Sequence, residues 1–99
     1  MIVNRRTFIV KRACMQRAVE LIQDDWPKFT HSHPRRLYTA SIAPFDTIAI
    51  EIEFENLQEY EESWAEWFAS PSTTEFMEEW FKLTESGGTN EIWELEASM

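Results

Sequence analysis

The chain has 99 residues, a formal net charge of −9 and a single cysteine, Cys14, so we expect one domain spanning residues 1–99 and no internal disulfide. The negative charge argues against nucleic acid as a partner, because it would repel the phosphate backbone. No apolar run approaches the ~20 residues of a membrane-spanning helix, and residues 1–10 lack the apolar run of a signal peptide, so a cytoplasmic protein without membrane contact is expected.

The first third of the chain alternates extended and helical patterns. Residues 2–10 are rich in β-branched and aromatic side chains, which favours a strand. In residues 12–26 the apolar positions recur at spacings of three and four, which predicts a helix with one buried stripe, ended by Pro27. Residues 27–34 are polar and predict a loop, and residues 35–43 return to strand character.

The next segment has the clearest strand pattern in the sequence. Ile48, Ile50, Ile52 and Phe54 alternate with Ala49 and with glutamates. Because successive side chains of a strand point to opposite faces, one face is predicted to lie in the core and the other to be acidic.

The second half of the chain is mainly helical in pattern. Asn56 and Glu59 have the spacing of a capping box, which predicts the start of a helix with Leu57, Tyr60, Trp64, Trp67 and Phe68 on its apolar face. Ser70-Pro71 predicts a break, after which Thr73 or Thr74 is expected to cap a shorter helix that Gly87-Gly88 ends. The apolar face of this helix is expected to carry Phe76, Met77, Trp80 and Phe81, and residues 91–96 predict a last strand.

This order of elements predicts a ferredoxin-like α+β fold. Its four-stranded antiparallel sheet carries the helices on one face, with the first strand between the third and the fourth and the second strand at an edge. The other face of the sheet would expose apolar surface to water. We therefore expect a homodimer in which two such faces pack together.

Two segments resemble a known superfamily. Arg6-Thr7-Phe8 followed by Lys11 looks like the opening strand of NIPSNAP-like domains, in which an Arg-Thr-aromatic run precedes a lysine and a helix. Residues 53–76 are similar to the strand, helix, Ser-Pro break and short helix of the dimeric α+β barrel superfamily, which also includes antibiotic-biosynthesis-monooxygenase-like proteins. The resemblance implies a ligand cavity between the helices and the sheet of each subunit.

The resemblance also bears on cofactors. Haem-degrading members use an asparagine on the first strand, a tryptophan on the second helix and a histidine on the helix that follows. Asn4 and either Trp64 or Trp67 match the first two, but residues 73–80 contain no histidine. Without an axial ligand we expect no haem, and no other cofactor is indicated.

Cofactor-independent oxygenases of the superfamily provide a second expectation. Such an enzyme needs a pocket that binds an electron-rich aromatic substrate, stabilises its anion and excludes water. Asn4, Trp67 and Tyr38, with His33 as a general base, are the candidate catalytic residues, and Trp64, Phe76 and Trp80 would line the pocket. Core packing alone explains the five tryptophans, because Trp26, Trp64, Trp67, Trp80 and Trp93 all occupy periodic core-facing positions. Core is therefore the more ordinary interpretation, and ligand wall stays open.

The remaining polar candidates each have two interpretations. Arg6 or Arg36 could anchor a carboxylate ligand, whereas cross-strand salt bridges to Glu51 and Glu53 are the more ordinary role for strand arginines. His31 and His33 could face a metal ion, but no third ligand follows from the spacing. We therefore expect no metal site and a solvated loop here.

Three classes of function follow from this sequence. The first is a homodimeric small-molecule-binding protein with an apolar, aromatic pocket between helices and sheet. The second is a cofactor-independent monooxygenase or related enzyme that acts on a small aromatic or polyketide-like substrate. The third is a structural or stress-related interaction module, which would have a filled core and no cavity.

Overall fold

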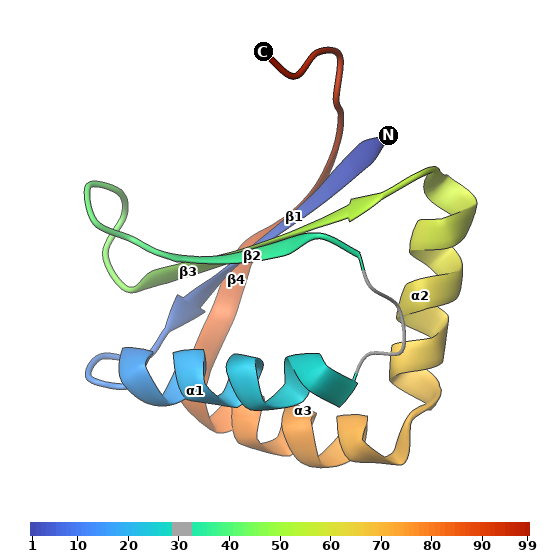
Figure 1. Cartoon of the computed structure of the whole chain (residues 1–99). Coiled ribbons are helices and arrows are strands. Elements are labelled where there is room, and N and C mark those ends of the chain that lie inside the picture. Colours follow the sequence, from blue (N-terminus) through green and yellow to red (C-terminus); the bar gives the residue numbers. More distant parts are fainter. Residues whose placement is uncertain (29–32) are drawn as a thin grey trace.

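The structure is a computed structural model that describes residues 1–28 and 33–99 (Figure 1). Within these ranges, no helix is both long enough and apolar enough to cross a membrane. Residues 29–32 of the loop expected at residues 27–34, including His31, lie outside the described residues. The elements in chain order are β1 (Ile2–Val10), α1 (Met15–Asp25), a 3-10 turn (Trp26–Lys28), β2 (Arg35–Thr39), β3 (Thr47–Phe54), α2 (Leu57–Ala69), α3 (Pro71–Leu83) and β4 (Thr84–Glu94).

The four strands form one antiparallel sheet in the order β2-β3-β1-β4. All three helices lie on the same side of this sheet, with α1 and α3 side by side and α2 at one end (Figure 1). This arrangement confirms the ferredoxin-like α+β fold and the strand order expected from the sequence. The face of the sheet opposite the helices carries no covering element among the described residues.

The core forms where β3 meets α1 and α3. Ile48, Ile50, Ile52 and Phe54 are at most 8% exposed, which confirms the predicted inward face of this strand. Ala18 and Ile22 of α1 and Trp80 and Leu83 of α3 complete the set of buried apolar residues packed on the sheet. Full burial of each large apolar side chain is worth about 1.5–3 kcal/mol, so this strand is the main source of cohesion between the layers.

The start of α2 follows the predicted capping chemistry. The side chain of Asn56 accepts a hydrogen bond from the backbone N–H of Glu59 at 2.9 Å. The Glu59 carboxylate in turn accepts from the backbone N–H of Glu55 at 3.3 Å, one residue earlier than in an ideal capping box. The predicted helix start at Asn56 is therefore confirmed.

The prediction that Thr73 or Thr74 caps the next helix is wrong. α3 begins at Pro71, because the fixed φ of proline suits the first helical position, and Ser70 is its N-cap residue. The hydroxyl of the buried Thr73 donates instead to the carbonyl of Trp67 in the last turn of α2. Thr73 therefore holds the two helices together at their bend.

The glycine pair does not end the helix either, so this prediction is also wrong. α3 ends at Leu83 and β4 follows at once, with the Thr84 hydroxyl donating to the Trp80 carbonyl at 2.9 Å. Gly87 and Gly88 lie inside β4, which is longer than the predicted strand at residues 91–96.

The glycines occupy a bulge in the pairing of β4 with β1. Thr7 pairs with Thr89 and Ile9 pairs with Glu85, so three residues of β4 stand opposite one residue of β1. Gly88 has a φ of +93°, and a Cβ atom there would come within 2.1 Å of the Thr7 carbonyl oxygen. Only glycine fits this position, because both the dihedral angle and the close backbone approach exclude a side chain.

Candidate functional site

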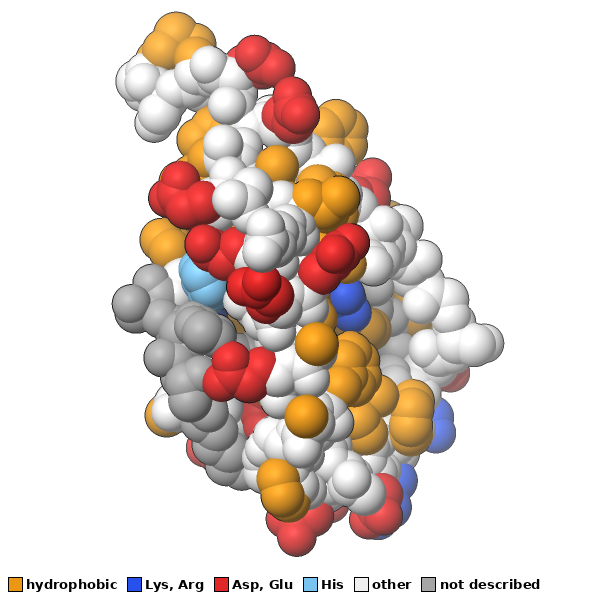
Figure 2. All heavy atoms as spheres, turned by 90° about the vertical axis from the view of Figure 1, so that its right-hand side faces the viewer, with side chains coloured by type: hydrophobic (Ala, Val, Ile, Leu, Met, Phe, Trp, Pro, Cys, Tyr) orange, Lys and Arg blue, Asp and Glu red, His pale blue; other side chains and the backbone are white. Residues whose placement is uncertain are grey.

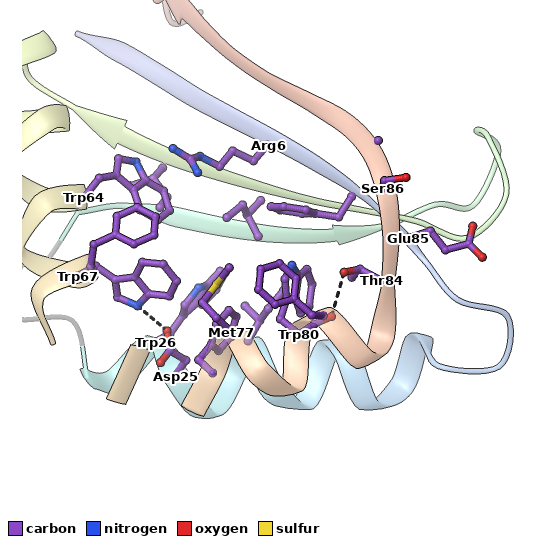
Figure 3. Close-up of a pocket in the computed structure, with 18 residues that line it drawn as sticks. Arg6, Asp25, Trp26, Trp64, Trp67, Met77, Trp80, Thr84, Glu85 and Ser86 are labelled. Carbon is purple, nitrogen blue, oxygen red and sulfur yellow. Dashed lines mark hydrogen bonds between the residues drawn. The ribbon is translucent and has the colours of Figure 1, made fainter. Parts of the chain in front are cut away.

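A cavity of about 430 Å³ lies between the sheet and the helices (Figure 3). This volume is within the ~300–1,000 Å³ range typical of small-molecule sites. From the sheet, β1 contributes Arg6 and Phe8, β3 contributes Ile50 and Ile52, and the start of β4 contributes Thr84, Glu85, Ser86 and Gly87. The helices contribute Ile22, Asp25, Trp26, Trp64, Trp67, Phe68, Phe76, Met77, Trp80 and Phe81.

Aromatic rings in mutual contact form much of this wall. Trp64 and Trp67 meet edge to face at 5.6 Å, Trp67 meets Phe76 at 5.4 Å, and Phe76 stacks on Trp80 at 5.6 Å. Trp80 is buried, whereas Trp26, Trp64 and Trp67 keep part of their surface accessible. These three tryptophans therefore belong to the wall of the cavity more than to the closed core.

Trp93 departs from the expected core position. It is 60% exposed on β4 and pairs with Val3 on the sheet face away from the helices. The strand predicted from this alternation is present as the end of β4, but Trp93 points to the open face of the sheet and not to the core.

The mouth of the cavity is marked by lining residues that are exposed. Phe68 of α2 is 57% exposed and Phe81 of α3 is 66% exposed. Glu85, Ser86 and Gly87 of the β4 bulge are also exposed and line the cavity. The opening therefore lies where α2, α3 and the start of β4 meet. Figure 2 shows hydrophobic side chains gathered beside the acidic ones on the side of the molecule that α2 presents.

A buried amide connects the sheet to the cavity wall. Asn4 on β1 is 1% exposed, and its side-chain nitrogen donates to the Asn90 side chain at 2.8 Å and to the Glu91 carbonyl at 2.9 Å. Its side-chain oxygen accepts from the Trp64 indole N–H and from Nε of Arg6, both at 3.2 Å. All the hydrogen-bonding capacity of the amide is used, so Asn4 fixes both cavity residues relative to the sheet.

Arg6 enters the cavity from β1 and lies against Trp64 (Figure 3). Its guanidinium carbon is 3.9 Å from the centre of the indole ring, which is a close cation–π contact. Its Nη2 donates to the Tyr60 hydroxyl at 3.4 Å. The cation is thus held in place by three side chains that carry no charge.

Asp25 contributes a carboxylate to the opposite wall. It is the last residue of α1, is 4% exposed and accepts a hydrogen bond from the Trp67 indole N–H at 2.9 Å. This bond orients the Trp67 ring at the junction of α1 and α2 (Figure 3). Both candidate tryptophans on α2 are therefore oriented through their indole nitrogens.

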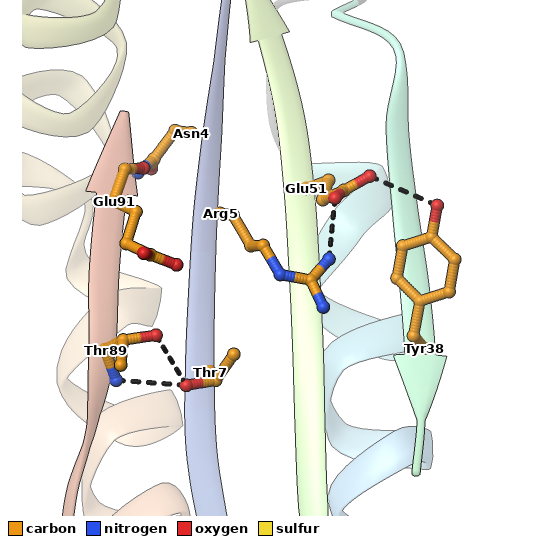
Figure 4. A network of polar contacts seen from close by, with 7 residues as sticks. All are labelled: Asn4, Arg5, Thr7, Tyr38, Glu51, Thr89 and Glu91. Atoms are coloured by element: carbon orange, nitrogen blue, oxygen red, sulfur yellow. Dashed lines mark hydrogen bonds and ion pairs between the residues drawn. The ribbon is translucent and has the colours of Figure 1, made fainter. Parts of the chain in front are cut away.

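Tyr38 lies on the open face of the sheet, outside this cavity (Figure 4). Arg36, two residues earlier on β2, lies on the same face. The Tyr38 hydroxyl donates to Glu51 at 3.1 Å, and Glu51 pairs with Arg5 at 2.6 Å. Arg36 pairs with Glu53 at 3.1 Å, so the expected cross-strand salt bridges are present. Partial burial and the hydrogen bond and charge of Glu51 raise the pKa of the Tyr38 phenol above its ordinary value.

His33 joins a second polar cluster that the sequence did not reveal. Its Nδ1 is 3.1 Å from the Glu59 carboxylate, and its Nε2 is 3.3 Å from the Ser63 hydroxyl. The order Ser-His-Glu matches that of a serine nucleophile with its base. Ser63 is only 5% exposed and does not line the cavity, so the cluster serves to hold the segment before β2 against α2.

Among the described residues, no group of three His, Cys, Asp or Glu side chains could hold a metal ion.

The structure brings five of the predicted site residues to one cavity: Arg6, Trp64, Trp67, Phe76 and Trp80. Asn4 lies directly behind this cavity. No short sequence motif signals this cavity, because these five residues come from β1, α2 and α3, which lie far apart in the sequence.

Solved structures with the same fold belong to two named groups. An uncharacterised NIPSNAP domain protein from Burkholderia xenovorans superposes with a TM-score of 0.85 at 13% identity, covering 98% of this chain and 96% of that one. A NIPSNAP family protein of unknown function from Agrobacterium tumefaciens gives 0.81 at 20% identity, covering 94% and 86%. A putative antibiotic biosynthesis monooxygenase from Bordetella bronchiseptica gives 0.76 at 11% identity, covering 97% of each chain.

These likenesses confirm the fold that the sequence suggested. The chain has the α+β fold shared by NIPSNAP-like and antibiotic-biosynthesis-monooxygenase-like proteins over nearly its whole length. No protein-family model matches the sequence, and no curated protein gives a significant match. At these low identities the likeness concerns the fold and assigns no reaction.

The Asn4 contacts generate a first prediction. Replacing Asn4 with leucine leaves the buried Glu91 carbonyl and the Trp64 N–H without their partner, so Asn4→Leu should lower the free energy of unfolding by about 2–4 kcal/mol. Asn90→Ala removes a single bond to an exposed residue and should cost less than about 1 kcal/mol. Urea denaturation followed by circular dichroism measures both values, and a loss below about 1 kcal/mol in Asn4→Leu would show that the Asn4 network does not stabilise the fold.

Proposed function

We propose that this protein is a small-molecule-binding protein whose ligand occupies the aromatic cavity between helices and sheet. The observation that carries the proposal is the cavity itself, about 430 Å³ in volume and lined mainly by apolar side chains. Because this cavity opens to water, its aromatic walls expose apolar surface, which is costly unless a ligand covers it. The cavity therefore favours ligand binding over a purely structural interaction module.

The arrangement of the wall supports an aromatic ligand. Trp67, Phe76 and Trp80 present ring faces and edges in a continuous series, which suits offset or edge-to-face contact with a flat molecule. Few polar groups reach the cavity, and those that do, such as Arg6 and Asp25, are fixed by hydrogen bonds. This combination of apolar walls and few oriented polar groups is typical of small-molecule sites.

Blocking the cavity tests this proposal. Met77 of α3 is half-buried and lines the cavity, so Met77→Trp should place an indole in the ligand space. With 2-naphthamide as an uncharged aromatic probe, we expect titration calorimetry to show binding to the natural protein and an affinity at least about 10-fold lower for Met77→Trp. Thr74→Trp on the exposed side of the same helix is the matched control and should bind as the natural protein does. Absence of probe binding to the natural protein would refute the proposal.

We also propose that the protein is a homodimer formed through the open face of the sheet. On this face Trp93 of β4 is 60% exposed and Tyr38 of β2 is 43% exposed. Val3 and Ile9 of β1, which lies between these two strands, point to the same face. Packing two such faces together removes this apolar surface from water. The ion pairs of Glu51 and Glu53 are already closed within one chain, so they add no uncompensated charge to the interface.

A charge placed on this face should separate the subunits. Trp93→Glu would introduce a carboxylate and its symmetry copy into the interface, so native mass spectrometry should report a dimer for the natural protein and a monomer for the variant. Leu57→Glu changes a residue of similar exposure, 52%, on α2 and should leave the dimer intact. A monomeric natural protein at micromolar concentration would contradict the dimer while leaving the ligand proposal standing.

A second candidate function is a cofactor-independent monooxygenase that uses the same cavity. The observation that favours it is the position of Arg6, fixed by Asn4 and Trp64, which places a cation where an aromatic anion could be stabilised. In such a reaction a methylene carbon of the substrate loses both hydrogens and gains one oxygen atom from O₂, and the other oxygen leaves as water. Among the earlier catalytic candidates, Asn4 and Trp67 adjoin the cavity, whereas Tyr38 and His33 would act only from outside it.

Oxygen uptake separates this enzyme from a binding protein. With anthrone, which has an acidic methylene between two aromatic rings, we expect an enzyme to consume O₂ faster than the protein-free solution, and Met77→Trp to abolish the excess. An uptake rate equal to the protein-free rate would refute the oxygenase and leave the binding function in place.

A further inference from the structure

Arg6 places a positive charge in the cavity wall, and its contacts among the described residues are all with neutral groups. Its guanidinium lies in an otherwise apolar wall, and its contacts are the Trp64 ring, the Asn4 amide oxygen and the Tyr60 hydroxyl. Among the described residues no carboxylate pairs with it. A partly buried charge without a counter-ion is costly, and a bound anion would offset this cost.

The neighbouring arginines show that the chain does supply partners on the other side of the sheet. Arg5, the preceding residue, pairs with Glu51 at 2.6 Å (Figure 4). Arg36 pairs with Glu53 at 3.1 Å. Arg6 is the one basic residue among the described residues that line the cavity, and it points to the side where the strand has no acidic neighbour. Its Nη1 makes no hydrogen bond to the described residues and is left to meet a ligand.

The geometry of the guanidinium is fixed in advance. Stacking on Trp64 sets the plane of the group, and the bonds from Nε and Nη2 set its rotation. A rigid planar fork of N–H donors matches the two oxygens of a carboxylate, and little side-chain entropy is lost when the ligand binds.

The other charged groups of the cavity limit the ligand to a single negative charge. Asp25 lies on the wall opposite the sheet, whereas Glu85 lies at the exposed mouth with its carboxylate pointing away from the cavity (Figure 3). A ligand whose carboxylate meets Arg6 would bring a second acidic group at its far end toward the Asp25 carboxylate. Like charges at such short range in an apolar site are strongly unfavourable.

We infer that the ligand class of this cavity is a flat aromatic monocarboxylate, with its carboxylate on Arg6 and its rings against Trp67, Phe76 and Trp80. This inference rests on the proposed binding function and adds the charge and polarity of the ligand to it. It also assigns Arg6 as the residue that determines specificity.

A matched pair of probes tests the inference separately from the binding function. 2-Naphthoate and 2-naphthamide have nearly the same shape, and only the first is an anion at neutral pH. Titration calorimetry on the full-length protein should give an affinity about 10- to 100-fold higher for the carboxylate, as expected for a charge-assisted hydrogen bond. Naphthalene-2,6-dicarboxylate should bind at least about 10-fold more weakly than 2-naphthoate, because its second carboxylate would approach Asp25.

Three arginine variants connect the preference to one side chain. Arg6→Met should lose the preference for the carboxylate, so that the ratio of the carboxylate and amide affinities falls to about 1. Arg6→Lys keeps the charge without the planar fork and should retain an intermediate preference. Arg17→Met removes an exposed charge of α1 and should keep the full preference. Circular dichroism of each variant confirms that it is folded.

The outcomes distinguish the two proposals. If the amide and the carboxylate bind equally well, or if Arg6→Lys and Arg6→Met keep the full preference, the inference about the ligand class is wrong and the binding function stands. If neither probe binds to the natural protein, the binding function and the inference both fail.

Discussion

A single buried amide, that of Asn4, couples the pairing of the strands to the shape of the cavity. Its nitrogen holds β4 against β1 through Asn90 and Glu91, and its oxygen holds Arg6 and Trp64. Because a fully satisfied polar network in a low-dielectric interior has one strongly preferred arrangement, the positions of the cavity residues follow from the register of the sheet. The site is therefore built on the most rigid part of the fold, and the loops contribute little to its geometry.

The two faces of β1 carry arginines in different electrostatic environments. Arg5 points outward and closes a network with Glu51 and Tyr38, whereas Arg6 points inward and meets only neutral groups among the described residues. Consecutive residues of a strand necessarily face opposite sides, so one residue step changes a neutralised surface charge into an uncompensated internal one. In a chain with a net charge of −9, an inward arginine also creates a local site for anions that the overall charge would repel.

The sequence predicted those parts of the structure where a pattern of residues is compatible with only one structural interpretation. The alternation of Ile48 to Phe54 identified the central strand, and Asn56 identified the start of α2. The inward face of β1 was not readable, because Asn4 and Arg6 stand where apolar residues normally do. Tryptophans at helical spacing line a core and a cavity with the same pattern, so the cavity itself could not be predicted. The contact of His33 with Ser63 joins residues 30 positions apart, which no local pattern encodes.

The bulge that contains Gly87 and Gly88 has a consequence for how this protein can change over evolutionary time. Part of the entrance is bare backbone, and Gly88 is closed to every side chain because of its contact with the Thr7 carbonyl. Substitution there would disrupt the strand before it altered selectivity. At the entrance, the exposed aromatic residues of the helices, Phe68 and Phe81, can instead be exchanged without disturbing the pairing of the strands.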